Sequence, residues 1–315
     1  MIETYAFGEH MGDARPLLDE AMQAYAASHP EFCMISPDVG RAGMPEYINK
    51  FPKQYYNTGI AEMASCDLAS GLALEGFQPV IYGMSAFMSM RSCEGVRTSI
   101  CYQNANVKII GCNTGLSQGP CGSTHYALED LAIIRSFPNI VLCVPGDPEQ
   151  ALKAFDAALK YKGPVYIRLA NGRNEPSVYK SDYRFEFGKS IQIHEGNDAT
   201  IIACGIMVAY ALEAARRLEA EGIHVRVIDM HTIKPLDTEA VLQAAAETGK
   251  IITIEDAFIT GGLGGAVCEA IAGSGLGCKV TRMGVPDMFP GFGSFQDQME
   301  HLGFGIEAMM KAIKD

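Results

Sequence analysis

The chain has 315 residues, of which 48% are hydrophobic and 20% are charged, and its formal net charge at pH 7 is −12. A chain of this length is expected to form two domains, each large enough to bury a core. Nucleic acids and anionic membranes attract clustered Lys and Arg, so the negative charge and the lack of such clusters argue against both as main partners.

The amino-terminal residues are acidic, and the sequence contains no run of 18 apolar residues. We therefore expect a cytoplasmic protein that does not span a membrane. The ten cysteines form no Cys-x-x-Cys pair and lie mainly among apolar neighbours, which is typical of small buried hydrophobes. The seven histidines have no ligand spacing, so we expect no metal site made by this chain alone.

The first part of the chain alternates predicted helices and strands. Residues 15–27 have the spacing of an amphipathic helix, and residues 32–40 are predicted to be a buried strand that ends in a loop. Further helices are predicted at about 60–76, 85–103, 126–136 and 148–160, and further strands at 79–82, 107–112, 139–145 and 164–169. Such solidly apolar strands are typical of a parallel sheet covered by helices on both faces.

A second α/β unit is predicted after a polar, charged segment that begins at Asn171. We predict a linker at 176–187, a first domain at 1–175 and a second domain at 188–315. The second domain has predicted strands at 199–204, 225–230, 251–256 and 279–284, with helices near 206–221, 238–248, 261–273 and 296–313. The fold class is therefore α/β, with two consecutive three-layer α/β/α domains and largely parallel sheets.

Two stretches suggest functional sites. Glu62 lies in the first turn of the predicted helix 60–76, which is otherwise almost wholly apolar. A first-turn Glu commonly just interacts with the helix dipole, but a buried carboxyl can also share a proton with a ligand. A glycine-rich polar loop at 114–125 is too long for a simple connection.

The run Gly-Gly-Leu-Gly-Gly at 261–265 lacks the spacing of a dinucleotide-binding loop. We expect it to allow close packing of a helix N-terminus or to bind an anion there.

Four stretches, in the same order, resemble the carboxy-terminal half of a transketolase. They are GIAEMASCDLASGLALEG, CGSTHYALEDLAIIRSFPNIVLCVPGDPE, VIDMHTIKPLD and IEDAFITGGLGGAVCE. Residues 1 to about 175 resemble the pyrimidine-binding domain of that family, and about 188–315 resemble its carboxy-terminal domain. The family's Gly-Asp-Gly motif for diphosphate and magnesium is missing, because Gly146-Asp147 continues as Pro-Glu-Gln.

The resemblance therefore implies one subunit of a split transketolase. Such a subunit needs a separate amino-terminal subunit that carries the magnesium ligands, and the two are expected to form a heterotetramer containing a dimer of this chain. The implied reaction is thiamine-diphosphate-dependent transfer of a two-carbon ketol unit from a ketose to an aldose. In this family Glu62 would hydrogen-bond the aminopyrimidine ring of the cofactor, and His125 would contact substrate hydroxyls and move protons.

The resemblance also implies cofactor contacts at Glu62, Phe87, Met88 and Arg91. Met88 stands where the family has an aromatic ring stacked on the pyrimidine, and Met63 stands where it usually has Gln. We expect Phe87 to restore the stacking contact, and a thioether can also pack against a ring.

The substrate contacts implied by the resemblance include several departures from the family pattern. Arg15 falls where the family has an arginine for the substrate phosphate. Cys121 replaces an Asp that recognises a hydroxyl, while Asn113 and Asn171 replace a phosphate-binding His and Arg. We expect Arg173 to compensate for the missing arginine. The identity of the sugar, and whether it carries a phosphate, does not follow from the resemblance.

Two alternatives remain open from the sequence. The first is the beta subunit of a 2-oxo-acid dehydrogenase, or a relative of 1-deoxyxylulose-phosphate synthase, and decarboxylation of pyruvate would favour it. The second is a non-catalytic assembly or regulatory subunit that retains the fold. That alternative predicts that Glu62→Gln leaves the activity of the complex intact.

Overall fold

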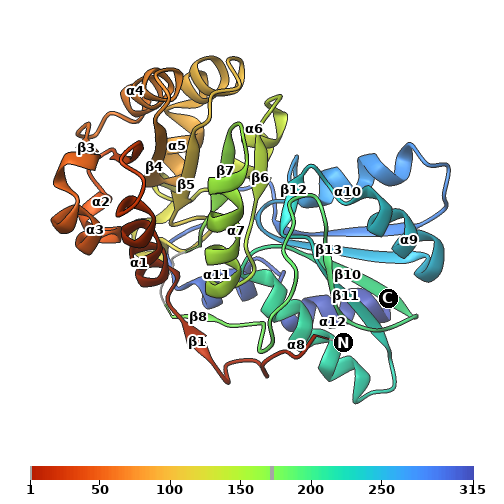
Figure 1. Ribbon diagram of the computed structural model, residues 1–315. Coiled ribbons are helices and arrows are strands. Elements are labelled where there is room, and N and C mark those ends of the chain that lie inside the picture. The colour runs from red at the N-terminus through yellow and green to blue at the C-terminus, as the bar shows by residue number, and fades with distance from the viewer. Residues whose placement is uncertain (1, 171–173) are drawn as a thin grey trace.

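Short apolar strands build a seven-stranded sheet in the first part of the chain (Figure 1). The computed structural model describes residues 2–170 and 174–315. The strand order is β12-β6-β7-β5-β4-β2-β3, and every neighbouring pair is parallel except β12 and β6. The strands are β2 (Phe32–Ser36), β3 (Tyr55–Asn57), β4 (Gln78–Met84), β5 (Lys108–Cys112), β6 (Val141–Cys143), β7 (Val165–Arg168) and β12 (Thr232–Lys234).

Alternate residues of these strands pack against two helical layers. On β4, Val80 and Tyr82 share a core with α1 (Ala14–Ala26), α3 (Pro45–Lys50) and α7 (Pro148–Lys160). Ile81 packs on the opposite face, with α4 (Glu62–Leu74), α5 (Ser85–Met90) and α6 (Asp130–Ser136). Both faces of the sheet are therefore covered, as its solidly apolar strands require.

A five-stranded sheet forms the second unit, in the order β14-β13-β10-β11-β9. Only β9 is antiparallel to its neighbour. Its strands are β9 (Ile191–His194), β10 (Ala199–Ala203), β11 (Val225–Asp229), β13 (Lys250–Phe258) and β14 (Lys279–Val285). One face packs on α8 (Met207–Glu219) and α12 (Ile306–Lys314), the other on α9 (Thr238–Thr248) and α10 (Leu263–Ala272). The predicted α/β class with largely parallel, three-layered sheets is confirmed.

Three predicted helices differ in their limits. The stretch 85–103 divides into α5 and a π-helical segment, Gly95–Cys101. Ser89, in the last turn of α5, and Ser92, just after it, donate their hydroxyls to backbone carbonyls four residues earlier. Residues 296–313 form α11 (Phe295–His301) and α12, separated by Gly303 with φ +78°. Helix α6 begins only at Asp130, because Ala127 pairs with Gly115 in an antiparallel bridge.

The two units exchange segments: a strand from the second half of the chain joins the first sheet, and the amino-terminal segment contacts the second unit. The sequence pattern did not reveal these contacts. Strand β12 comes from the second half of the chain but extends the first sheet at β6. Two short strands, β1 (Met11–Gly12) and β8 (Glu175–Pro176), pair with each other, and Arg216 of α8 donates to the carbonyl of Tyr5. The amino-terminal segment therefore contacts the second unit before it enters α1. The domain division at 176–187 stays a prediction.

The glycine-rich run at 261–265 binds a carboxylate from the chain itself, that of Glu255. Glu255, on β13, accepts hydrogen bonds from the backbone N–H groups of Leu263 and Gly264, both at 2.8 Å, at the first turn of α10. A Cβ on Gly262 would lie 1.9 Å from Glu255 Oε2, so only glycine permits this approach. The helix N-terminus thus binds an internal anion.

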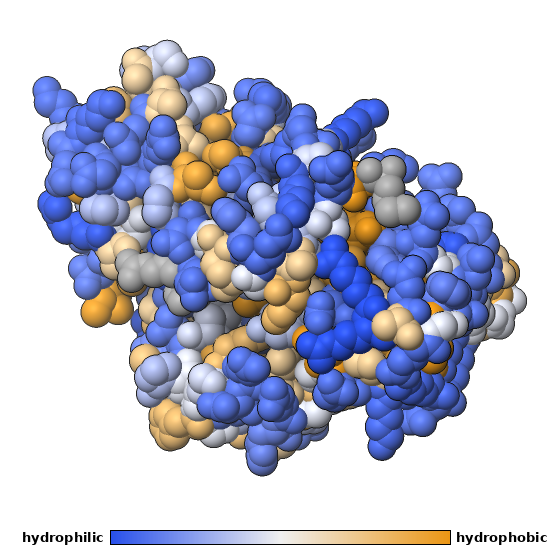
Figure 2. Space-filling model, turned by 90° about the horizontal axis from the view of Figure 1, so that it is seen from below, coloured by the Kyte–Doolittle hydropathy of each residue, from blue (hydrophilic) through white to orange (hydrophobic). Residues whose placement is uncertain are grey.

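Polar residues predominate on the surface seen from below, with apolar residues in small groups among them (Figure 2). In the two stretches that the structure describes, no helix combines the length and the apolar character needed to cross a bilayer.

A buried polar cluster links α7, the segment after β8 and β11. Asp229 Oδ2 accepts hydrogen bonds from the hydroxyl of Tyr179 and from Gln150 Nε2. Asp147, which caps α7, accepts from the backbone N–H of Val178 at 2.8 Å. Burial raises the pKa of Asp229 from its ordinary 3.8 to about 7, and burial also raises the pKa of Asp147.

This pKa shift predicts a pH-dependent stability. Between pH 3.8 and about 7 the folded chain keeps the Asp229 proton while the unfolded chain has lost it, so unfolding releases a proton and stability falls as pH rises. Asp229→Asn removes this contribution, and we expect a shallower decline in the free energy of unfolding over that range, measured by urea denaturation. Part of the pH dependence should remain in this variant, because burial also raises the pKa values of Glu255 and Asp256 to about 7.

The exposed Asp287 provides the control, because Asp287→Asn should retain the full wild-type pH dependence. An Asp229→Asn profile that parallels wild type throughout would contradict this assignment of the proton.

Candidate functional site

The predicted catalytic and cofactor residues follow the carboxyl ends of three parallel strands. Glu62 comes after β3, Phe87 and Arg91 come after β4, and His125 lies in the loop after β5. Open α/β sheets bind ligands at this edge, because the chain leaves each parallel strand there through a loop.

Glu62 is the first residue of α4 and is buried, with only 3% of its side chain exposed. The turn before it is built by Asn57, whose side-chain oxygen accepts the N–H of Gly59 at 2.8 Å, and by Gly59 itself at φ +69°. Arg91 Nη1 donates to Glu62 Oε2 at 3.0 Å. Within the part of the chain that the structure describes, Glu62 Oε1 has no hydrogen bond, so it remains available as an acceptor.

Arg91 connects Glu62 to two other predicted residues. Its guanidinium lies 4.6 Å from the ring centroid of Phe87, a cation–π arrangement. The Phe87 ring in turn packs edge-to-face on His125, with centroids 5.5 Å apart. Glu62, Arg91, Phe87 and His125 therefore form one continuous set of contacts, which we call the carboxylate–aromatic set.

Met88 does not join this set. Its side chain is fully buried in the core between the sheet and α4, and it fills the space above Gly83, where a Cβ would come within 2.8 Å of Met88 Sδ. The structure thus presents the half-buried Phe87, not Met88, as the aromatic face beside Glu62. Met63 is partly buried and approaches Gly95, where a Cβ would lie 2.8 Å from its sulfur.

The predicted substrate residues are divided between two places. Arg15, on α1, donates to Asn113 Oδ1 at 2.6 Å, and Asn113 has φ +57° directly after β5. Cys121 is exposed in the glycine-rich loop, with its sulfur 3.8 Å from Gln118 Oε1. Asn171 and Arg173 lie outside the described residues.

A buried ionic network supports the base of the loop and was not predicted from the sequence. Arg168 Nε donates to Asp130 Oδ2 at 2.8 Å, and Arg168 Nη2 donates to the carbonyls of Ala127 and Asp256. Asp256 Oδ1 accepts the N–H of Leu116 at 3.2 Å. One signal was available: Glu255 and Asp256 are adjacent acids in an otherwise apolar strand, and buried charges need partners.

The residues present fit the aminopyrimidine end of thiamine diphosphate. A buried carboxylate with one open oxygen and a half-buried aromatic ring are the groups that this end requires. The described residues contain no group of three His, Cys, Asp or Glu side chains placed to hold a metal ion.

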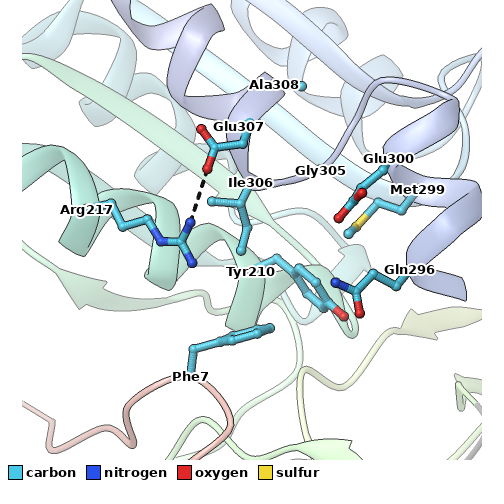
Figure 3. Close-up of a pocket in the computed structure, with 10 residues that line it drawn as sticks. All are labelled: Phe7, Tyr210, Arg217, Gln296, Met299, Glu300, Gly305, Ile306, Glu307 and Ala308. Carbon is cyan, nitrogen blue, oxygen red and sulfur yellow. Dashed lines mark hydrogen bonds and ion pairs between the residues drawn. The ribbon is translucent and has the colours of Figure 1, made fainter.

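A cavity of about 590 Å³ lies elsewhere, between the amino-terminal segment, α8 and the last two helices (Figure 3). Phe7 and Tyr210 form one side of it, and Arg217 pairs with Glu307 across the other. None of the predicted site residues lines this cavity. The chemistry of the carboxylate–aromatic set, and not cavity size, therefore identifies the candidate site.

Comparisons with known proteins give consistent matches along the chain. The families "Transketolase, pyrimidine binding domain" and "Transketolase, C-terminal domain" match residues 12–174 and 188–309. An apulose-4-phosphate transketolase subunit of Phocaeicola vulgatus is 35% identical over 299 residues, which cover 94% of this chain and 95% of that protein. The 6-deoxy-6-sulfo-D-fructose transketolase subunit SqwH of Clostridium sp. strain MSTE9 is 35% identical, covering 92% and 90%.

Among solved structures, a split gene transketolase, described as an inactive beta4 tetramer, matches with a TM-score of 0.86. It is 34% identical, and the match covers 97% of this chain and 98% of that one.

The Glu62–Arg91 pair can be tested by a double-mutant cycle. Removing one partner leaves a buried carboxylate without its cation, so Arg91→Met should lower the free energy of unfolding by about 1–2 kcal/mol, discounted for the half-exposed guanidinium. Combining it with Glu62→Gln should cost less than the sum of the single changes, as measured by urea denaturation. Arg97→Met, at an exposed arginine, is the matched control. Additive single and double effects would contradict a direct interaction.

Proposed function

The chain belongs to the transketolase family, and on that premise we propose that it is the pyrimidine-binding subunit of a split, thiamine-diphosphate-dependent transketolase. The observation that carries the proposal is the buried Glu62 carboxylate, which is paired with Arg91 and lies beside the Phe87 ring. We assign the pyrimidine-binding domain to residues 1–175 and the carboxy-terminal domain to 188–315.

In the proposed mechanism Glu62 and Phe87 serve the cofactor. When bound, thiamine diphosphate would supply a nucleophilic carbon for the ketose carbonyl. Glu62 Oε1 would accept a hydrogen bond from the aminopyrimidine ring, while Arg91 holds Oε2 and so fixes the orientation of the carboxylate. Phe87 provides the apolar face against which a ring can pack.

His125 and the Arg15–Asn113 pair serve the sugar. His125, held edge-on to Phe87, binds a substrate hydroxyl and moves a proton as the carbon–carbon bond breaks. Arg15, with Asn113 as its neighbour, binds an anionic group of the ketose, and Arg173 and Asn171 contribute to the same recognition. Two relatives are named for apulose 4-phosphate and 6-deoxy-6-sulfo-D-fructose, both sugars with an anionic substituent, which supports a charged ketose as substrate.

The decarboxylating alternatives are less well supported. Two relatives that this chain matches over nine-tenths of their length are transketolase subunits, whereas in four 1-deoxy-D-xylulose-5-phosphate synthases the match covers less than half of the protein. A purely regulatory subunit would not require an intact carboxylate–aromatic set.

The missing half of the cofactor site requires a partner. We propose that a separate amino-terminal subunit holds the diphosphate and magnesium, and that two copies of each subunit form a heterotetramer. The exposed Ile60, Leu68 and Leu74, on and beside α4, offer apolar contact surface along the helix that begins at Glu62. Ten free cysteines suit a reducing compartment, which supports a cytoplasmic location.

The activity is tested on the complex of this chain with its amino-terminal subunit. Cleavage of xylulose 5-phosphate, or of one of the relatives' ketoses, should require thiamine diphosphate and magnesium. Glu62→Gln should lower kcat by about 10²- to 10⁴-fold, the usual contribution of a positioned proton-transfer group. The exposed Glu94 is the control carboxylate, and Glu94→Gln should leave turnover unchanged.

Wild-type activity in Glu62→Gln would overturn the catalytic assignment and favour a regulatory subunit. Release of carbon dioxide from pyruvate, without ketol transfer from any of the sugars, would favour the decarboxylating alternatives instead.

The assembly makes a separate prediction. The chain alone should self-associate without ketol transfer, and adding the amino-terminal subunit should give the heterotetramer and restore activity; light scattering after gel filtration measures both states. Leu68→Glu places a charge on the exposed face of α4 and should weaken the self-association, whereas Glu94→Gln should not. A monomer that is fully active alone would contradict the requirement for a partner.

A further inference from the structure

The segment 286–294, between β14 and α11, lies on the loop that carries His125. Gly293 N donates to the carbonyl of Gly119 at 3.3 Å, and Ser123 Oγ donates to the carbonyl of Pro290 at 2.6 Å. The hydroxyl of the buried Tyr126 donates to the carbonyl of Gly291 at 2.9 Å. Three hydrogen bonds therefore join the second unit to both sides of His125.

Two glycines of the loop permit this close contact. A Cβ on Gly119 would lie 1.7 Å from the carbonyl oxygen of Gly293, a backbone atom that has no room to move aside. Gly122 has φ +66° and ψ −162°, a conformation that is essentially restricted to glycine. The ring of Phe292 packs against it, because a Cβ there would come within 2.6 Å of that ring.

Two further hydrogen bonds from the second unit support the loop. Asp256 Oδ1 accepts the N–H of Leu116 near the start of the loop, and Phe258 N donates to the carbonyl of Leu128 after it. Strand β13 thus holds the loop near both ends, and the segment 286–294 holds its middle. In the described residues His125 hydrogen-bonds only locally, to Thr124 and Gly122, and its ring packs on Phe87, so its place depends on these supports together with Phe87.

We propose that the segment 286–294 is a clamp that positions His125, with Phe292, Ser123 and Tyr126 as positioning residues and Gly119 and Gly122 as its contact points. This inference rests on the proposed function, because His125 is the substrate-binding group that the clamp serves. The carboxy-terminal unit therefore influences how the ketose is held, although Glu62, Phe87 and Arg91 all lie in the first unit. Releasing the clamp should disorder the loop and weaken substrate binding while leaving the Glu62–Arg91–Phe87 contacts intact.

Cys121 provides a direct probe of the clamp, because it is exposed in the middle of the loop whereas six of the other nine cysteines are buried. Its alkylation by iodoacetamide, quantified by peptide mass spectrometry, reports loop mobility without any turnover. We expect Phe292→Ala and Gly119→Ala to speed this alkylation about 3- to 10-fold, as expected for the loss of one or two contacts. In the assembled complex the KM for the ketose should rise by a similar factor, and thiamine-diphosphate affinity should not change.

Phe289→Ala is the matched control, since Phe289 is in the same segment and is as exposed as Phe292, at 78% and 76%. It should behave as wild type, and Phe292→Leu should restore part of the wild-type KM. Tyr126→Phe, a conservative change that removes the Gly291 bond, tests the clamp again if Gly119→Ala fails to fold.

Unchanged alkylation of Cys121 and unchanged KM in Phe292→Ala and Tyr126→Phe would overturn the clamp. An equal response to Phe289→Ala would also overturn it, because that response would reflect general destabilisation of the segment. If the wild-type complex transfers no ketol unit, the proposed function fails, while the alkylation rates still decide whether the segment holds the loop.

Discussion

A fully buried guanidinium, that of Arg168, joins the segments on which the candidate site depends. A buried charge is tolerated only when it is paired and hydrogen-bonded, and Arg168 meets this requirement through Asp130 and the carbonyls of Ala127 and Asp256. These partners belong to the start of α6, the end of the His125 loop and the second sheet. The loop conformation and the packing of the two units are therefore coupled through one side chain.

Elements of the scaffold also fix the position of the Glu62 carboxylate. The Gly59 turn sets where α4 begins, and the apolar helix behind it excludes water from Glu62. Arg91 orients the carboxylate from the next strand end, and Phe87 joins it to His125. Each group is held by an element of the scaffold before any ligand arrives. Such preorganisation is how a protein stabilises charge during a reaction without reorganising its own groups.

Local patterns predicted most of the fold and directed attention to Glu62, but they did not reveal the contacts made over long sequence separations. The apolar runs identified most of the strands, and Glu62 stood out because it is an acid at the head of an otherwise almost wholly apolar helix. Strand β12 was missed because Thr232–Lys234 is too short to show a period, and its partner β6 lies in the other unit. The burial of Met88 could not be read from the sequence, because adjacency to Phe87 does not say which of the two side chains faces the core. The contacts of residues 286–294 with the loop depend on tertiary packing alone.

The proposed function requires that this chain supply the carboxylate that activates thiamine diphosphate. The most direct test is hydrogen–deuterium exchange at the thiazolium carbon of the cofactor bound to the assembled complex, followed by acid quench and proton NMR. We expect fast exchange in wild type and a rate close to that of free cofactor in Glu62→Gln, with the cofactor still bound. Equally fast exchange in both proteins would contradict it, because the proton would then leave without help from Glu62.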